Sequence, residues 1–81
     1  MKKLQVLGPG CPKCEKLAAR TAEAVERRGV EASVEKVTDI MQITSFGVMM
    51  TPALVLDGEV KAKGKLLGVD EIAALLHGEG S

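Results

Sequence analysis

The spacing of apolar residues changes twice within the first 37 positions. Residues 4–7 form a short apolar run that predicts a strand, and the turn-forming sequence of residues 8–10 ends it. Within residues 12–28, Leu17, Thr21 and Val25 recur at four-residue spacing beside several alanines, which predicts a helix with a proline in its first turn. Residues 30–37 alternate apolar and polar side chains, the period of a half-buried strand. This order predicts a strand, helix, strand unit in which the inward residues of the last strand are Val30, Ala32 and Val34.

The next segment predicts a short helix. Thr38 suits the N-cap position, and the helix is expected to run through about Phe46 with Gly47 beyond its end. Ile40 and Ile43 are expected to face inward. This element has the weakest pattern in the chain, since it spans only two turns.

The last part of the chain predicts a hairpin and a helix. Residues 53–56 and 59–63 form two strand-like runs separated by Asp57-Gly58, a pair that favours a two-residue hairpin turn. Lysines alternate along the second run, as is common in strands at the edge of a sheet: Lys61 and Lys63. A final helix is expected from about Val69 to His77, with Gly78 as its stop.

The resulting order βαβαββα predicts an α/β fold with a four-stranded mixed sheet and helices on both faces. A right-handed crossover in the first unit would place the apolar strand of residues 4–7 in the interior of that sheet. Residues 1–78 are expected to form a single domain, and residues 79–81 a flexible C-terminal tail.

Composition narrows the possible functions. The 81 residues carry 11 Lys and Arg against 11 Asp and Glu, so neither a nucleic-acid partner nor a membrane partner is favoured. Phe46 is the only aromatic residue, which means that the core must consist of aliphatic side chains and Met. The N-terminal residues lead straight into a strand rather than into a signal-peptide core. We therefore expect a cytoplasmic protein, and we expect it to be a monomer.

The candidate chemistry lies in Gly10-Cys11-Pro12-Lys13-Cys14, which places Cys11 at the N-cap of the first helix and Cys14 one turn inside. The unpaired N–H groups and the positive end of the helix dipole favour a thiolate on Cys11. Pro12 fixes the entry of the chain, and Lys13 adds a positive charge. Such surroundings lower a cysteine pKa from about 8.5 to roughly 3.5–7.5. Cys11 is the candidate nucleophile, and Cys14 is the candidate resolving thiol.

A CxxC pair also forms half of many zinc sites, so metal binding is an alternative. Zinc takes about four ligands, and this sequence offers no third cysteine and one histidine, His77, which is more often a helix-end residue. Met49 and Met50 are soft copper ligands, although Met more often fills gaps or forms apolar surface. We expect no metal site and no cofactor.

A second motif, Thr51-Pro52, opens the third strand-like run. With the CxxC motif and Asp57-Gly58, it gives a sequence that resembles the thioredoxin superfamily, in particular its small glutaredoxin-like members of about 80 residues. The resemblance spans nearly the whole chain. It implies a thioredoxin-like fold and a thiol-disulfide oxidoreductase, with a cis bond before Pro52 that faces the cysteines. It also implies that Thr51 and Pro52 contact the substrate, with the Thr51 backbone pairing with an extended segment. Met50 is expected to add apolar surface on which the substrate rests.

This chain departs from the superfamily pattern at several positions. Many thioredoxins have a buried Asp six residues before the nucleophile, where this chain has Gln5, which cannot accept a proton as a base. The Gly-Gly signature of glutaredoxins is matched only loosely by residues 64–70. The resemblance implies disulfide-containing protein substrates, and the electron donor is either a reductase of the thioredoxin type or glutathione-based.

Two other functions are consistent with the motif. One is a soft-metal carrier of the ferredoxin-like type, which also has a CxxC after its first strand. Such carriers usually have Met two residues before the first cysteine, where this chain has Pro9, and their element order differs. The other is a domain that senses redox state through its disulfide without turning over a substrate.

Overall fold

The computed structural model describes residues 2–79 of the chain, with side chains through residue 76. Its elements, in chain order, are β1 (Lys2–Leu7), α1 (Pro12–Arg28), β2 (Ala32–Val37), α2 (Ile40–Ser45), β3 (Ala53–Leu56), β4 (Glu59–Lys63) and α3 (Val69–Glu79). The strands form one sheet in the order β2-β1-β3-β4. β1 is parallel to β2 and antiparallel to β3, and β3 is antiparallel to β4. The predicted α/β fold with a four-stranded mixed sheet is confirmed, as is the interior position of β1.

The first helix has the ends that the sequence predicts. Cys11 is its N-cap, Pro12 occupies its first turn, and Gly29 closes it in the left-handed conformation. The N–H of Gly29 donates to the carbonyl of Val25 at 3.0 Å, which satisfies one of the free carbonyls of the last turn. Because both ends are capped, the 17 residues of α1 form a rigid rod whose N-terminus carries Cys11.

The hairpin between β3 and β4 also forms as predicted. Asp57 and Gly58 have φ angles of 50° and 83°, the two positive values of a type I′ turn. The register shifts at residues 54–55, so that Leu54 pairs with Ala62 and Val55 pairs with Val60. Despite this irregularity, Ala53 remains opposite Lys63 at the end of the hairpin nearest the CxxC motif.

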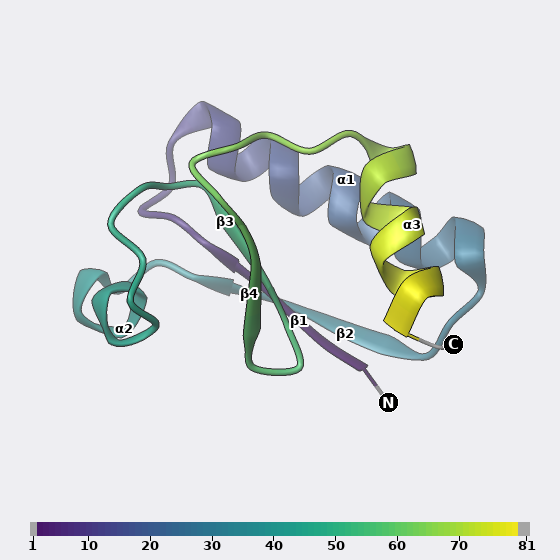
Figure 1. Ribbon diagram of the computed structural model, residues 1–81. Coiled ribbons are helices and arrows are strands. Elements are labelled where there is room, and N and C mark those ends of the chain that lie inside the picture. The colour runs from purple at the N-terminus through teal and green to yellow at the C-terminus, as the bar shows by residue number, and fades with distance from the viewer. Residues whose placement is uncertain (1, 80–81) are drawn as a thin grey trace.

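Two apolar clusters occupy opposite faces of the sheet. Helices α1 and α3 lie side by side on one face, and α2 lies on the other (Figure 1). The first cluster contains Leu4, Val6, Leu17, Ala18, Ala24, Leu54, Leu56, Leu67, Ile72 and Leu76. The second contains Leu7, Val37, Ile43, Val48, Ala53 and Val55, with Phe46 and Val60 packed against it. The alternation of β1 and β3 residues between the two clusters follows from the two-residue period of a strand.

Two details of the predicted helix around residues 38–46 are wrong. The N-cap is Asp39 rather than Thr38, and its carboxylate accepts the N–H of Met41 at 2.9 Å. The helix ends at Ser45 with Phe46 as its C-cap, within one residue of the predicted end. Ile43 is buried as predicted, but Ile40 is 59% exposed. Helix α2 has only six residues, and Ile40 at its first position lies outside the apolar cluster on this face of the sheet.

The predictions for β2 and α3 also need correction. β2 begins at Ala32 rather than Val30, and Val34 is 36% exposed on this edge strand of the sheet. Helix α3 continues through Gly78 to Glu79. Glycine disfavours a helix by about 1 kcal/mol, and the packing of α3 against α1 outweighs that preference. The side chain of His77 and the last two residues of the predicted tail lie outside the described part of the structure.

Candidate active site

The two cysteines meet at the N-terminus of α1. Cys11 and Cys14 form a disulfide, with Cα atoms 5.1 Å apart. The N–H of Cys14 donates to the Cys11 sulfur at 3.3 Å, so the sulfur itself caps the helix. Cys11 is half-buried, whereas Cys14 is only 4% exposed. An incoming sulfur can therefore reach Cys11 more readily than Cys14.

Gly8 is a residue of this site that the sequence analysis treated only as part of a turn. A Cβ built on Gly8 would overlap the Cys14 sulfur and would lie 2.8 Å from the Cys14 Cβ. It would also lie 3.9 Å from the Cβ of Thr51. The absence of a side chain at Gly8 thus leaves room for Cys14. A glycine between a strand and a CxxC helix is the signal that could have identified this position.

The Thr51-Pro52 segment lies beside the cysteines, about forty positions further along the chain. The peptide bond between the two residues is cis, Pro52 is buried, and Thr51 is half-buried. The paired register of β3 begins at Ala53, which leaves the backbone of Thr51 outside the sheet ladder. The carbonyl of Pro52 accepts the N–H of Gly64 at 2.9 Å, and this bond ties the segment to the end of the hairpin.

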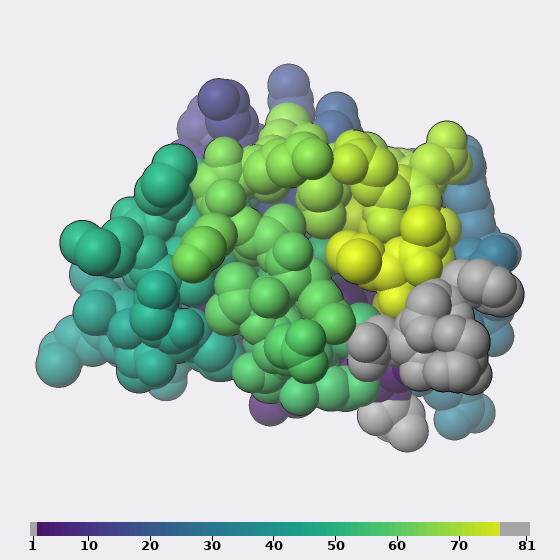
Figure 2. Space-filling model, in the orientation of Figure 1, coloured from purple at the N-terminus to yellow at the C-terminus, as the bar shows by residue number. Residues whose placement is uncertain are grey.

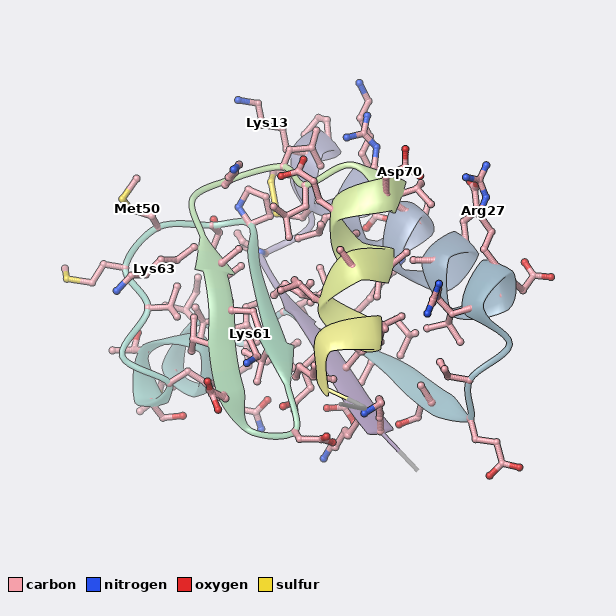
Figure 3. The ribbon with its side chains drawn as sticks, turned by 45° about the vertical axis from the view of Figure 1, so that its right-hand side comes forward. Lys13, Arg27, Met50, Lys61, Lys63 and Asp70 are labelled. Atoms are coloured by element: carbon pink, nitrogen blue, oxygen red, sulfur yellow. A yellow bond between two sulfur atoms is a disulfide. The ribbon has the colours of Figure 1, made fainter. Side chains whose placement is uncertain are left out.

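Met50 directly precedes this segment, and its side chain packs against Gly64. Its side chain is 61% exposed, and a Cβ built on Gly64 would lie 2.7 Å from the Met50 Cε. Gly64 has a φ of 68°, so both its conformation and the space above it favour glycine. Figure 3 shows Met50 and Lys63 pointing outward on the same side of the molecule, with Lys13 extending from the start of α1. Met50 therefore presents an apolar surface at the rim of the site.

Some charged residues of α1 and of the segment before α3 form ion pairs, and Lys13 does not. Glu15 pairs with Lys36 at 2.8 Å, and Lys65 pairs with Glu71 at 3.5 Å. The N–H of Gly68 donates to Glu71 at 3.1 Å, and this bond, together with the charge of Lys65, holds the pKa of Glu71 below its ordinary value. Lys13 is exposed and forms no ion pair with another residue among positions 2–76.

An apolar groove opens next to the disulfide, and the sequence analysis did not predict it. It has a volume of about 250 Å³ and is lined by Pro9, Ile40, Ile43, Thr44, Val48, Met49 and Thr51. Met49 is 95% exposed at its edge. The groove escaped the sequence analysis because its walls come from three separate segments and because Ile40 was expected to face the core.

Comparison with known proteins agrees with this geometry. The family model of the thioredoxin domain matches residues 2–77. The chain belongs to the thioredoxin family. It is 37% identical over 76 residues to a thioredoxin of Methanothermobacter thermautotrophicus, an alignment that covers 94% of this chain and 99% of that protein. It is 36% identical over 69 residues to a thioredoxin of Methanocaldococcus jannaschii, covering 85% of this chain and 79% of that protein.

Family membership confirms the resemblance found in the sequence and makes the protein a thiol-disulfide oxidoreductase. The structure contains a disulfide between Cys11 and Cys14, the pair that the sequence predicts as the redox centre. Cys14 of the CxxC motif and Thr51 of the distant Thr51-Pro52 segment, two motifs that the resemblance pairs, both lie close to Gly8 in the structure.

Gln5 of this thioredoxin-family protein is a buried polar residue of β1. Its side-chain amide donates to the carboxylate of Glu35 at 3.0 Å across the β1–β2 pair. The amide is thereby satisfied, and the carboxylate nearest to it belongs to the exposed edge strand β2. Gln5 therefore acts in the structure as a partner of Glu35.

No group of three or more His, Cys, Asp or Glu side chains in the described part of the chain is arranged to hold a metal ion. None of the helices in residues 2–79 is both long enough and apolar enough to cross a membrane.

Proposed function

We propose that the protein exchanges its Cys11–Cys14 dithiol with disulfides of protein substrates, with Cys11 as nucleophile and Cys14 as resolving thiol. The observation that carries this proposal is the difference between the two sulfurs: Cys11 caps the helix and is half-buried, whereas Cys14 is buried below it. Backbone N–H groups at a helix N-terminus favour the thiolate over the thiol. Pro12 fixes the turn into the helix, and Lys13 adds a positive charge that favours the same anion.

The reaction has two steps. The Cys11 thiolate attacks one sulfur of the substrate disulfide, forming a mixed disulfide and releasing the other substrate sulfur as a thiolate that takes up a proton. Cys14 then loses its proton and attacks the Cys11 sulfur. The second step forms the Cys11–Cys14 disulfide and releases the second substrate thiol. Two electrons pass from the protein to the substrate, and an external dithiol or two thiols must return them before the next cycle.

Thr51, Pro52 and Met50 are proposed to hold the substrate. Thr51 lies next to Gly8 and so close to Cys14, and its backbone is outside the sheet ladder. An extended substrate segment can pair with this backbone as a short additional strand, which is a common mode of peptide recognition. Met50 offers an exposed apolar side chain at the rim of the same segment. The donor that resets the disulfide is proposed to be a reductase of the thioredoxin type or a glutathione-based system. We also propose that the protein acts in the cytoplasm as a monomer.

The roles of the two cysteines can be tested by trapping. The reduced Cys14→Ser variant should accumulate a stable mixed disulfide with a disulfide-containing protein such as insulin, because Cys11 attacks and no resolving thiol follows. The Cys11→Ser variant should form none. The two variants carry the same substitution at opposite ends of the disulfide and differ in which sulfur remains, so each is the matched control for the other. If iodoacetamide at pH 7 modifies Cys14 of the reduced wild-type protein faster than Cys11, the assigned roles are reversed.

The donor can be identified with the wild-type protein. Insulin reduction is measured with NADPH and a thioredoxin reductase in one assay, and with NADPH, glutathione and glutathione reductase in the other. Turnover in only one assay identifies the donor class. Dithiothreitol as the reductant is the control that shows the protein is active. If dithiothreitol supports turnover and neither enzymatic system does, both proposed donors are contradicted.

A further inference from the structure

The connection between β4 and α3 consists of residues 64–68 and contains no helix or strand. We call it the 64–68 loop, and Figure 1 shows it running across α1. Because these residues belong to no helix or sheet ladder, their backbone N–H and C=O groups need hydrogen-bond partners from neighbouring elements or from water. The partners that they find decide which parts of the fold the loop connects.

The start of the 64–68 loop is bound to the Thr51-Pro52 segment. The N–H of Gly64 donates to the carbonyl of Pro52 at 2.9 Å, and the side chain of Met50 packs against the same glycine. Gly64 adopts the left-handed conformation with a φ of 68°, which sets the direction of the chain at this point. A displacement of Gly64 therefore either moves Pro52 or breaks the bond between them.

The end of the 64–68 loop is bound to α1. The guanidinium of Arg20 donates to the carbonyl of Leu67 at 3.1 Å. The side chain of Leu67 is buried in the same apolar cluster as Leu17, which lies three residues before Arg20 on α1. A hydrogen bond and burial in a shared cluster therefore hold Leu67 to the helix that begins at the CxxC motif.

Arg20 differs from the other cations of α1 in its surroundings. It is half-buried, whereas four others are exposed: Lys13, Lys16, Arg27 and Arg28. Arg20 forms no ion pair with another residue among positions 2–76. A guanidinium stays charged near neutral pH, so its partial burial is favourable only where its N–H groups find acceptors. The carbonyl of Leu67 is such an acceptor, and a hydrogen bond from a charged donor is stronger than one between neutral groups.

The sheet places the two halves of the site only up to the ends of its strands. β1 and β3 are paired as far as Leu7 and Ala53. Residues 11–14 lie beyond that end of β1, and residues 50–52 precede β3. In the described part of the chain, no hydrogen bond joins these two groups of residues directly. The 64–68 loop supplies an indirect connection between them, because its two ends are bound to the two halves.

We propose that Arg20 is a positioning residue of the redox site. By holding Leu67 against α1, it fixes the place of Gly64 and thereby of the Thr51-Pro52 segment relative to Cys11. This inference rests on the proposed dithiol exchange and adds a residue to it that touches neither the substrate nor the reacting sulfurs.

The proposed role makes the effect of Arg20 depend on the substrate. A protein substrate must pair with the backbone of Thr51 while its sulfur reaches Cys11, so its rate depends on the relative position of the two. A misplacement of about 1 Å caused by a distant substitution can slow a reaction by about 100-fold. A small disulfide needs no contact with Thr51, and its rate depends on Cys11 alone.

The experiment compares the two kinds of substrate in single-turnover reactions of the reduced protein. Insulin is the protein disulfide, and hydroxyethyl disulfide is the small one. Formation of the Cys11–Cys14 disulfide is followed by quenching with iodoacetamide and mass spectrometry. The Arg20→Met variant removes the donor and keeps a long unbranched side chain of similar helix propensity. We expect its rate constant to fall about 10-fold with insulin and to change by less than about 2-fold with hydroxyethyl disulfide.

Two further variants separate position from stability. Arg20→Lys restores a charged donor and should bring the insulin rate constant back to within about 3-fold of wild type. Val25→Ala is the stability control, because Val25 lies on the same helix and packs against the same cluster. It should lower stability without changing the ratio of the two rate constants. If Val25→Ala loses reactivity with insulin as strongly as Arg20→Met does, the effect comes from stability and the positioning role is overturned.

A second measurement examines the connection without any substrate. Amide hydrogen exchange of the oxidised protein, followed by NMR, should be about 10-fold faster at the Gly64 N–H in Arg20→Met, because release of Leu67 lets the loop open more often. The Gly29 N–H, which donates to the Val25 carbonyl at the end of α1, is the internal control and should not change. Unchanged exchange at Gly64 would overturn the proposed connection.

The outcomes distinguish this inference from the exchange reaction on which it rests. Equal losses with insulin and hydroxyethyl disulfide in Arg20→Met would mean that the variant alters Cys11 itself, and would overturn the positioning role. An unchanged rate with insulin would overturn it as well. A wild-type protein that reacts with neither substrate would instead overturn the proposed dithiol exchange.

Discussion

The two faces of the sheet differ in how completely they are covered. Helices α1 and α3, of 17 and 11 residues, close one face, and the cluster beneath them contains ten buried residues. The other face is covered by the six-residue helix α2, which leaves Ile40, Met49 and Met50 exposed beside it. In Figure 2, the segment around residues 40–51 protrudes from one side of the molecule, away from α3.

Because of this difference, the two faces contribute differently to stability and to binding. Burial of apolar side chains is the main stabilising contribution to a fold, so the α1 and α3 face holds most of the stability of this small protein. The α2 face retains apolar surface that can be buried by a partner. The disulfide lies at the boundary, since Cys11 heads the rigid helix α1 while Thr51 and Pro9 belong to the groove.

The largest expected effect is a core truncation on the closed face. Leu17→Ala should lower the free energy of unfolding by about 2–5 kcal/mol, because Leu17 is fully buried between α1 and the sheet. Ile40→Ala on the open face should change it by less than about 0.5 kcal/mol, since this side chain is mostly exposed. Urea unfolding of both reduced variants measures the difference. Equal losses in the two variants would contradict the division between the faces.

Gly8→Ala tests the boundary between the faces. The added methyl group overlaps the Cys14 sulfur, so we expect a loss of about 1–3 kcal/mol in stability and slower formation of the Cys11–Cys14 disulfide. The measurements are urea unfolding and the rate of oxidation by a small disulfide. Gly68→Ala is the matched control, since a Cβ there meets an atom only at an ordinary contact distance of 3.6 Å. A Gly8→Ala variant that oxidises at the wild-type rate would show that the space is not required.

The Asp39→Ala variant tests whether α2 can be destabilised without an effect on α1. The variant loses the cap of the helix, which should cost about 0.5–2 kcal/mol in stability. Hydrogen exchange should increase in residues 40–45 and leave α1 unchanged, because α1 has its own caps. Thr38→Ala, at the position that the sequence suggested as the cap, is the control and should have little effect.

The smallest expected effect concerns Glu71 at the start of α3. The Gly68 N–H and Lys65 lower the pKa of this carboxyl group, so its ionised form stabilises the folded state. That contribution is fully present above the ordinary Glu pKa of about 4.3 and is lost as pH falls through the lower folded value. Thermal unfolding should show Glu71→Gln slightly less stable than wild type at pH 7 and equal to it well below pH 4.

The sequence by itself determined the elements whose signals are local. The cap of α1 at Cys11, its end at Gly29 and the Asp57-Gly58 turn each depend on the conformational preferences of one or two residues, and all formed as predicted. The periodicity of apolar residues also determined the element order and the central position of β1. Nucleophile and resolving roles for Cys11 and Cys14 follow from the same local geometry, and they stay predictions until they are tested.

Only the tertiary structure decided what depends on contacts between distant segments. The exposure of Ile40 and Val34 follows from how far each helix extends over the sheet, which no local pattern encodes. Glycine is needed at position 8 because the sulfur of Cys14, six residues later in the sequence, packs against it. The groove forms where Pro9, the residues of α2 and the segment before Pro52 meet. Local preferences act over one or two turns of chain, whereas a binding surface is made by packing, and packing is a property of the whole fold.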